Sequence, residues 1–233
     1  MVYLENPVEY SALADEMAWE KTYAAEAEAR RRRSPVLYRA ARAPKAVWQR
    51  LLRRDKLVRW ARRYFARGPV LDVGCAEGHT LERFPPQFVP YGIEISAKLS
   101  RMAQRRFAPR GGRVVHGDAL SALRQFDAGF FTGTIMTSFL EHEPEPRAVL
   151  AAASRVMRAD SCLIVKVPNF ASWNRALRGV RWCGFRFPDH VNYFTPKLLT
   201  ALLAGSGLRV LRFGLFDRFP TSDSMWLVAR RTD

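Results

Sequence analysis

Four residues with regular spacing, Asp72, Gly74, Ala76 and Gly78, lie in the stretch VLDVGCAEG. A run of strand-forming residues leads into this stretch, and a segment typical of a helix follows it. Glycine has no Cβ atom, so the backbone at positions 74 and 78 can turn tightly and come close to a ligand. The free N–H groups at the start of the following helix favour an acceptor or an anion. The spacing therefore predicts a loop that wraps a nucleotide-like ligand.

The details of this loop argue against a dinucleotide site. A dinucleotide fingerprint has the order G-x-G-x-x-G, whereas position 76 is Ala and position 79 is His. An acid, Asp72, also stands two residues before the first glycine. Both departures disfavour a nicotinamide-dependent oxidoreductase. Because alanine adds one methyl group and tolerates a negative φ, we expect Ala76 to weaken binding modestly rather than to abolish it.

Two further acids, Glu94 and Asp118, close the next two predicted strands, in YGIEIS and HGDAL. Together with D-x-G-x-A-x-G, they resemble the motifs of class I S-adenosylmethionine (SAM)-dependent methyltransferases. In that family the loop wraps the amino-acid part of SAM, the acid at the Glu94 position accepts hydrogen bonds from the ribose hydroxyls, and the acid at the Asp118 position binds the adenine amino group. The alternative is that both acids only cap helices. The resemblance implies a SAM site made of Asp72, Gly74, Cys75, Ala76, Gly78, Glu94, Ile95, Asp118, Ala119 and Thr137.

Two histidines, His142 and His190, are the candidate catalytic residues. The stretch LEHEPEP resembles the loop after the fourth strand in the ubiquinone-pathway O-methyltransferases, and FPDHVNYFT resembles a broader bacterial subgroup. A hydroxyl or ammonium acceptor must lose a proton during methyl transfer, and histidine suits that role. The alternative is that His142 caps a helix and His190 forms a loop hydrogen bond.

Other residues of these two loops could support the acceptor site. Asp189 is placed to orient His190, and three aromatic residues could form the walls of an apolar acceptor pocket, although core packing explains them as well: Trp173, Trp182 and Tyr193. Some ubiquinone-pathway relatives hold a divalent metal with acids and the histidine of the first loop. Here Ser138 stands where such an acid is needed, so we predict no metal.

The positive charge of the chain is concentrated in front of the glycine loop. Residues 30–67 contain 15 Lys and Arg and one acid, so they carry +14 of the net charge of +16. A basic amphipathic helix of this kind could lie on an anionic membrane, with Trp48, Trp60, Tyr64 and Phe65 near the headgroups. It could instead follow a phosphate backbone, or form the solvated face of a lid. We regard nucleic acid as the less favoured partner.

The elements that position these residues alternate between strand and helix. Strands are predicted at 70–74, 91–95, 113–116, 128–136, 162–168, 208–214 and 225–230, and helices near 78–84, 97–108, 145–158 and 196–205. The pattern predicts an α/β fold with a Rossmann-like, doubly wound, seven-stranded, mostly parallel sheet and an antiparallel last strand. We expect a helical N-terminal arm over 1–67 and a SAM-binding domain over 68–233.

Composition limits the remaining function classes. The sequence has no secretory leader and no apolar run near the ~20 residues that cross a bilayer. Three cysteines without a CxxC pair favour a reduced compartment, so we expect a cytoplasmic protein, peripheral at the inner membrane surface if the arm binds lipid. The sequence thus predicts a SAM-dependent methyltransferase acting on a small molecule, at the oxygen of a phenol, sugar or lipid-linked intermediate. The alternatives are a nucleic-acid-binding protein or RNA methyltransferase, and a SAM-binding protein without turnover.

Overall fold

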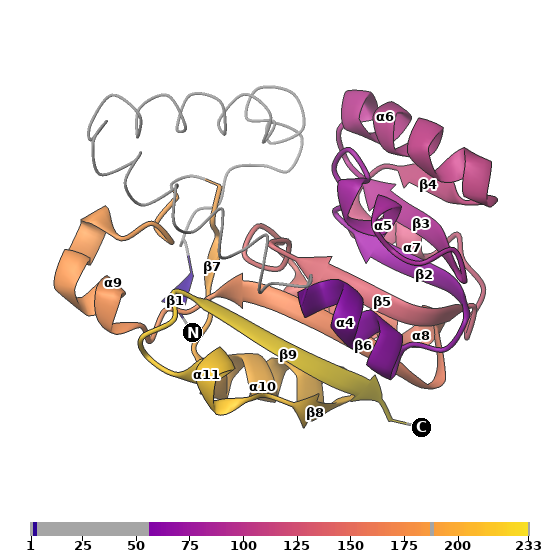
Figure 1. Cartoon of the computed structure of the whole chain (residues 1–233). Helices are drawn as coiled ribbons and strands as arrows, with labels where there is room; N and C mark the ends of the chain where they lie inside the picture. Colours follow the sequence, from indigo (N-terminus) through magenta and orange to yellow (C-terminus); the bar gives the residue numbers. More distant parts are fainter. Residues whose placement is uncertain (1, 4–55, 187–188, 233) are drawn as a thin grey trace.

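A seven-stranded sheet forms the centre of the molecule (Figure 1). The structure is a computed structural model, and it describes residues 2–3, 56–186 and 189–232. The strand order is β4-β3-β2-β5-β6-β9-β8. The strands are β2 (Gly68–Val73), β3 (Phe88–Glu94), β4 (Arg113–His116), β5 (Phe131–Thr137), β6 (Met157–Pro168), β8 (Leu208–Arg212) and β9 (Ser224–Arg231).

Strand β2 marks the point where the strand order changes direction. It pairs in parallel with β3 on one side and with β5 on the other. In an open α/β sheet, such a switch point leaves a crevice at the carboxyl ends of the strands. Strand β9 is antiparallel to both of its neighbours, β6 and β8. The predicted fold, including the antiparallel last strand, is confirmed.

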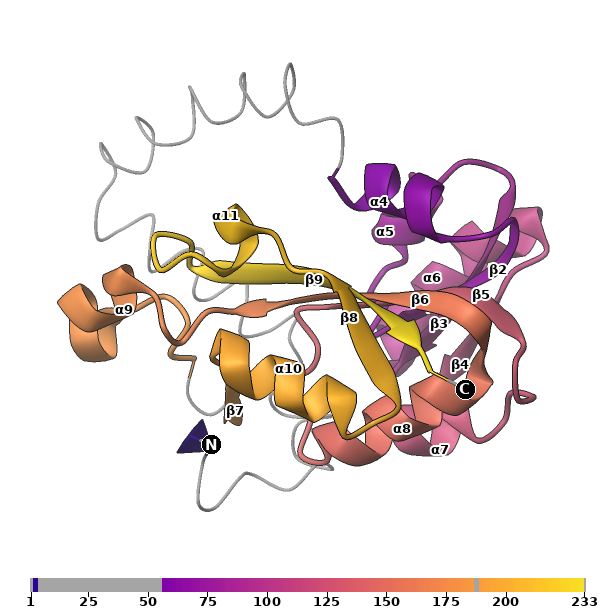
Figure 2. The same cartoon turned by 90° about the horizontal axis from the view of Figure 1, so that it is seen from below.

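Helices cover both faces of the sheet. One face carries α4 (Lys56–Tyr64), α5 (His79–Glu82) and α6 (Ala97–Phe107), and the other carries α7 (Ala119–Leu123), α8 (Pro146–Val156) and α10 (Pro196–Ala204). Figure 2 shows the sheet between α4 and α5 above it and α7, α8 and α10 below it. Each layer buries its own apolar cluster against the sheet, which holds the strand ends in fixed positions.

Most predicted boundaries differ from the structure by a few residues, and contacts explain two of these differences. Helix α8 ends at Val156 rather than at 158, because Met157 pairs with Phe131 and starts the long strand β6. Strand β5 starts at Phe131 rather than at 128, because Gly129 has a φ of +70° and donates its N–H to Arg155 O at 3.0 Å.

Helix α4 is a basic helix, and its apolar side packs into the core. The side chains of Leu57, Trp60 and Ala61 are buried, and the Trp60 ring meets Trp226 edge-on at 6.1 Å. Phe65 is also buried, edge-on to Phe88. The expectation that Trp60 and Phe65 face lipid headgroups was therefore wrong, because the sheet covers both rings. Trp48 and the rest of residues 4–55 lie outside the described residues, and the division of the chain at 67/68 stays a prediction.

Short elements complete the chain. Strand β1 (Val2–Tyr3) pairs antiparallel with β7 (Asn192–Tyr193). Helix α9 (Trp173–Arg178) follows β6, α11 (Leu215–Arg218) lies between β8 and β9, and two 3-10 turns are η1 (Ala108–Arg110) and η2 (Gly179–Arg181). Cys75, Cys162 and Cys183 are free thiols. Within the described part of the chain, no helix has the length and apolar character needed to cross a bilayer.

Candidate active site

The glycine loop after β2 runs through three residues of left-handed conformation. The φ angles of Gly74, Ala76 and Gly78 are 74°, 47° and 83°. For Ala76 this corrects the expectation of a negative φ, since an L-residue in this region costs roughly 1–2 kcal/mol. The Ala76 N–H donates to Glu94 Oε2 at 2.8 Å, which helps to hold the strained backbone. The alanine therefore affects the stability of the loop as well as the space in it.

Gly78 has a packing role. A Cβ atom at this position would lie 2.8 Å from the Phe107 ring, so the missing side chain lets the loop pack against α6. The Cys75 side chain is buried, and burial raises the pKa of its thiol well above the usual value. Neither residue lines the cavity that follows β2. Their assignment to the cofactor stays a prediction.

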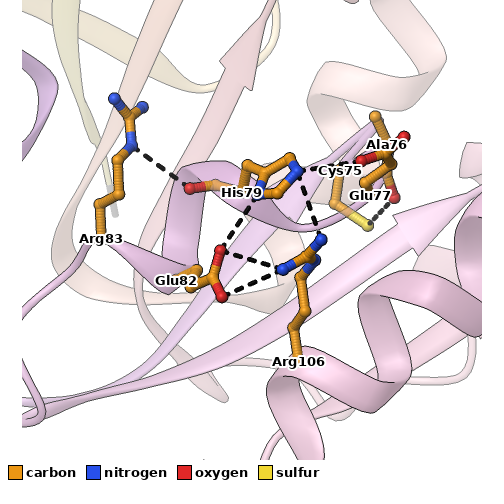
Figure 3. A network of polar contacts seen from close by, with 7 residues as sticks. All are labelled: Cys75, Ala76, Glu77, His79, Glu82, Arg83 and Arg106. Atoms are coloured by element: carbon orange, nitrogen blue, oxygen red, sulfur yellow. Dashed lines mark hydrogen bonds and ion pairs between the residues drawn. The ribbon is translucent and has the colours of Figure 1, made fainter.

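A polar network fixes the start of α5 to α6 (Figure 3). The two ring nitrogens of His79 contact Glu77 Oε2 at 2.9 Å and Glu82 Oε2 at 3.0 Å. Arg106 on α6 donates to Glu82 Oε1 at 3.1 Å. These groups lie on the surface, and together they tie the loop carrying Ala76 to the neighbouring helix.

The carboxyl ends of β2, β3, β4 and β5 enclose a cavity of about 250 Å³. Seven of its lining residues were predicted, six for the cofactor and His142 for catalysis: Gly74, Ala76, Glu94, Ile95, Ala119, Thr137 and His142. Sequence reasoning missed Ile93, Leu99, Gly117, Phe139 and Glu143, and it considered Asp189 and Ser138 only for other roles. Several of these are apolar or lie in loops, where no residue type signals a ligand. Phe139 could have been suspected only from its position in the loop that follows a predicted strand, 128–136.

Two predicted acids sit at the edges of this cavity with different surroundings. The Glu94 carboxylate accepts from the N–H groups of Ala76 and Ser96, at 2.8 and 2.9 Å. Asp118 lies just behind the wall formed by Gly117 and Ala119. Its Oδ1 caps α7 by accepting from Ser121 N at 2.8 Å. One oxygen of Asp118 thus caps a helix, as the alternative expected. The contact of Asp118 with adenine stays a prediction.

The carboxyl of Asp72 is buried beneath the loop and next to Glu94. Burial and the negative charge of Glu94 raise the pKa of Asp72 well above its usual value. Its Oδ1 atom has no hydrogen-bond partner. A buried carboxyl beside a second acid ionises more readily when a cation is placed near it. The site is therefore suited to a ligand that carries a positive charge.

The two candidate histidines come together from loops 48 residues apart. Their ring centroids lie 4.6 Å apart, edge to face. The Nδ1 atoms contact backbone oxygens at 2.8 Å, His142 at Asp189 and His190 at Gly184. Because a carbonyl oxygen can only accept, each Nδ1 carries the proton and each Nε2 keeps a lone pair. Burial lowers the pKa of His142 to about 4 and that of His190 to about 3, so both rings are neutral.

Glu141 joins these histidines in a buried cluster. One potential ligand atom from each of the three residues lies within 4.8 Å of the others. The Glu141 side chain is 1% exposed, its Oε2 has no partner, and burial raises its pKa to about 7. All three residues line a second cavity of about 270 Å³, which shares Ser138 and His142 with the first. The spacing of residues in the sequence could not predict that His190 joins this cluster.

The aromatic residues expected around the acceptor do not line either cavity. Trp182 is buried and donates its Nε1–H to Asp223 at 2.9 Å, and Tyr193 packs against Phe170 and Phe185. Trp173 is 56% exposed and contacts Phe219. Asp189 uses its backbone oxygen to orient His142 rather than His190. The core-packing alternative was therefore right for Trp182 and Tyr193.

Comparison with known proteins assigns the family. A family profile described as a methyltransferase domain matches residues 39–212. The chain belongs to the class I SAM-dependent methyltransferase family. A curated relative of this methyltransferase, a ubiquinone biosynthesis O-methyltransferase from Xanthomonas axonopodis pv. citri, is 24% identical over 151 residues, which are 60% of this chain. The match spans 62% of that relative's length.

Solved structures share the methyltransferase fold. A SAM-dependent methyltransferase from Archaeoglobus fulgidus superposes with a TM-score of 0.57 at 18% identity, over 81% of this chain and 100% of the other. A putative methyltransferase from Bacillus halodurans C-125 gives 0.58 at 14% identity, over 76% and 99% of the two chains. At these identities the likeness shows the fold alone.

SAM, the cofactor of this family, fits the residues of the first cavity. The cofactor carries a positively charged amino group and a sulfonium, which matches the buried pair of Asp72 and Glu94 and the unpartnered Asp72 oxygen. Gly74 presents backbone without a side chain at the cavity wall, and the Glu94 carboxylate, an acceptor for hydroxyl donors, lines the same cavity. When bound, SAM supplies the electrophilic methyl group.

Proposed function

We propose that this methyltransferase transfers the methyl group of SAM to a hydroxyl oxygen of a small-molecule acceptor. The observation that carries the proposal is the position of His142, which lines both the cofactor cavity and the neighbouring cavity. Methyl transfer requires the acceptor atom to approach opposite the leaving sulfur, and positioning supplies much of the acceleration. A wall shared by two cavities is a suitable place for that encounter.

The chemistry of the cluster supports oxygen as the acceptor atom. A hydroxyl must lose its proton as the new bond forms, and a neutral imidazole with a bare Nε2 can accept it. The hydrogen bond from His142 Nδ1 to Asp189 O fixes the ring in that tautomer. The name of the curated relative, an O-methyltransferase, agrees with this choice.

A screen with labelled SAM tests the proposed function. The full chain is incubated with a small-molecule extract, and labelled products are separated and fragmented to locate the methyl group. The proposal expects a low-molecular-weight O-methyl ether. Labelled RNA would instead support the nucleic-acid alternative, and S-adenosylhomocysteine binding without any labelled product would support a SAM-binding protein without turnover.

We further propose a cytoplasmic protein whose basic segment, residues 30–67, rests on the anionic inner membrane surface. The support is the charge of +14 in this segment. Co-sedimentation of the full chain with phosphatidylglycerol vesicles, compared with phosphatidylcholine vesicles, tests it. Binding to the anionic vesicles that disappears at high salt is expected, and equal recovery with both kinds of vesicle would contradict it.

A further inference from the structure

The large apolar side chains that are exposed in the described part of the chain all lie on two short segments, α9 with η2 and α11 with the residue after it. We call these six residues the apolar patch: Trp173, Leu177, Val180, Leu215, Phe216 and Phe219. The side chains of Leu177, Val180 and Phe216 are 86%, 90% and 87% exposed. Single exposed apolar residues are ordinary, whereas a contiguous group of them marks an interaction surface.

Contacts join the two segments into one surface. The Trp173 ring meets the Phe219 ring at 5.9 Å, and the Trp173 N–H donates to Pro220 O at 2.7 Å. Asn174 Nδ2 donates to Asp223 Oδ2 at 2.7 Å, which ties the start of α9 to the start of β9. Figures 1 and 2 show α9 projecting from the body of the molecule on the side that carries α11. The apolar patch is therefore held in place by the frame of the domain.

The two acids on these segments each lie close to a cation. Asp217 on α11 forms an ion pair with Lys56. Burial opposes ionisation of Asp223, but its hydrogen bonds and the positive charge of Arg178 bring its pKa below the usual value, so it is a carboxylate at neutral pH. Neither acid gives the apolar patch an excess of negative charge.

Three arginines on the same segments have no carboxylate partner. Ion pairs found among the described residues include none of Arg175, Arg181 and Arg218. Arg181 and Arg218 are exposed, and Arg175 lies over the Phe170 ring at 4.5 Å and donates to Phe170 O. The apolar patch thus combines exposed apolar side chains with positive charge that no acid balances.

This combination fits the interface of an anionic bilayer. Aromatic and aliphatic side chains enter the boundary between headgroups and acyl chains, while the long side chains of arginines reach the lipid phosphates. A second copy of the chain fits less well, because a self-complementary contact would bring the same arginines together. Charge complementarity therefore favours lipid over another copy.

We propose that the apolar patch inserts into the surface of an anionic bilayer, with its arginines bound to lipid phosphates. This inference rests on the membrane contact proposed above, and it adds a second surface, outside residues 30–67, that penetrates the bilayer. After η2 the chain continues into Cys183 and Gly184, which line the second cavity. Insertion of the apolar patch therefore brings the proposed acceptor cavity close to the bilayer surface.

Vesicle binding by the full chain tests the inference. The vesicles contain equal amounts of phosphatidylglycerol and phosphatidylcholine, and the double variant Leu177→Ser/Phe216→Ser removes one apolar side chain from each segment. We expect its affinity for the vesicles to fall about tenfold or more. The dependence of affinity on salt should stay as in wild type, because the variant loses no charge.

A second double variant is the control for this comparison. Ala97→Ser/Ala201→Ser changes exposed apolar residues on α6 and α10, outside the apolar patch, and should bind the vesicles as wild type does. Unchanged affinity for S-adenosylhomocysteine shows that both double variants are folded.

Trp173 reports whether the apolar patch enters the bilayer. Lipids with brominated acyl chains quench tryptophans that lie near the bromine atoms. Trp173→Phe keeps an apolar ring, so it should bind the vesicles nearly as tightly as wild type while losing part of the quenching. The other tryptophans are the same in both proteins, so the difference in quenching belongs to Trp173.

The proposal is overturned if Leu177→Ser/Phe216→Ser binds the vesicles as tightly as wild type, or if Trp173→Phe is quenched to the same extent. Either result, with vesicle binding kept, would leave the basic segment 30–67 as the membrane contact. No binding of wild type would contradict both surfaces. A wild-type dimer that this double variant converts to a monomer, with equal vesicle binding, would assign the apolar patch to a second copy.

Discussion

The backbone N–H of Ala76 donates to Glu94 Oε2 at 2.8 Å, so one carboxylate both lines the cofactor cavity and holds the strained turn. Ala76 keeps a φ of 47°, where glycine is more stable. The conformation of the loop therefore has a cost in stability, which the hydrogen bond to Glu94 offsets in part.

Replacing Ala76 by Gly should stabilise the protein. Relief of the left-handed alanine is worth up to about 1 kcal/mol in the free energy of unfolding, reduced in part by the greater freedom of glycine in the unfolded chain. Urea unfolding of both proteins measures the difference. A less stable Ala76→Gly variant would show that the left-handed turn is not strained.

Replacing Asp72 by Asn should change how stability depends on pH. The folded-state pKa of Asp72 is raised, so above the unfolded pKa of about 3.9 the native state holds a proton that the unfolded state has lost. Wild-type stability therefore falls as pH rises from about 4 toward the raised value. The Asp72→Asn side chain does not titrate, so the variant does not lose stability in this way as pH rises.

Urea unfolding at several pH values measures the difference in the free energy of unfolding between Asp72→Asn and wild type. The other titrating groups are the same in both proteins, so their contributions cancel in this difference. The variant should gain relative stability with increasing pH, and it should bind SAM more weakly because it cannot become negative. A pH-independent difference would contradict the assigned protonation of Asp72.

Replacing His142 by Ala should lower turnover by about 10²–10⁴-fold, the usual contribution of a general base, once an acceptor is known. Affinity for S-adenosylhomocysteine should change little, because His142 lies on the acceptor side of the cavity. His116→Ala is the matched control, since the exposed His116 lines neither cavity and its Nε2 contacts Ile95 O at 3.0 Å. Equal loss of cofactor affinity and turnover would assign His142 to cofactor binding instead.

Metal removal should leave methyl transfer unchanged. Glu141, His142 and His190 offer donor atoms close together, but Lys166 and Arg186 oppose a divalent cation there. Metal analysis of the purified protein should find less than one equivalent, and EDTA should have no effect on activity. Activity lost in EDTA and restored by one divalent metal would refute the prediction.

Much of the cofactor side could be predicted from sequence, because Gly74, Glu94 and Ala119 stand at strand ends and strand ends converge in a parallel sheet. The conformation of Ala76 could not be predicted, because its left-handed φ depends on a hydrogen bond to a residue 18 positions away. The meeting of His190 with Glu141 could not either, because it depends on how a long loop folds back. The predicted surroundings of Trp60 and Phe65 were wrong, because an apolar stripe on a helix does not distinguish burial against a sheet from contact with lipid.

Calorimetric titration of S-adenosylhomocysteine into the full chain and into Glu94→Ala tests the central claim that the cavity beside β2 holds SAM. Glu145→Gln, which changes an exposed acid at the start of α8, serves as the matched control. We predict one site of micromolar affinity in wild type and in the control, weakened about tenfold or more in Glu94→Ala by loss of charge-assisted hydrogen bonds. Absence of binding to wild type, or the same affinity in Glu94→Ala, would contradict the account.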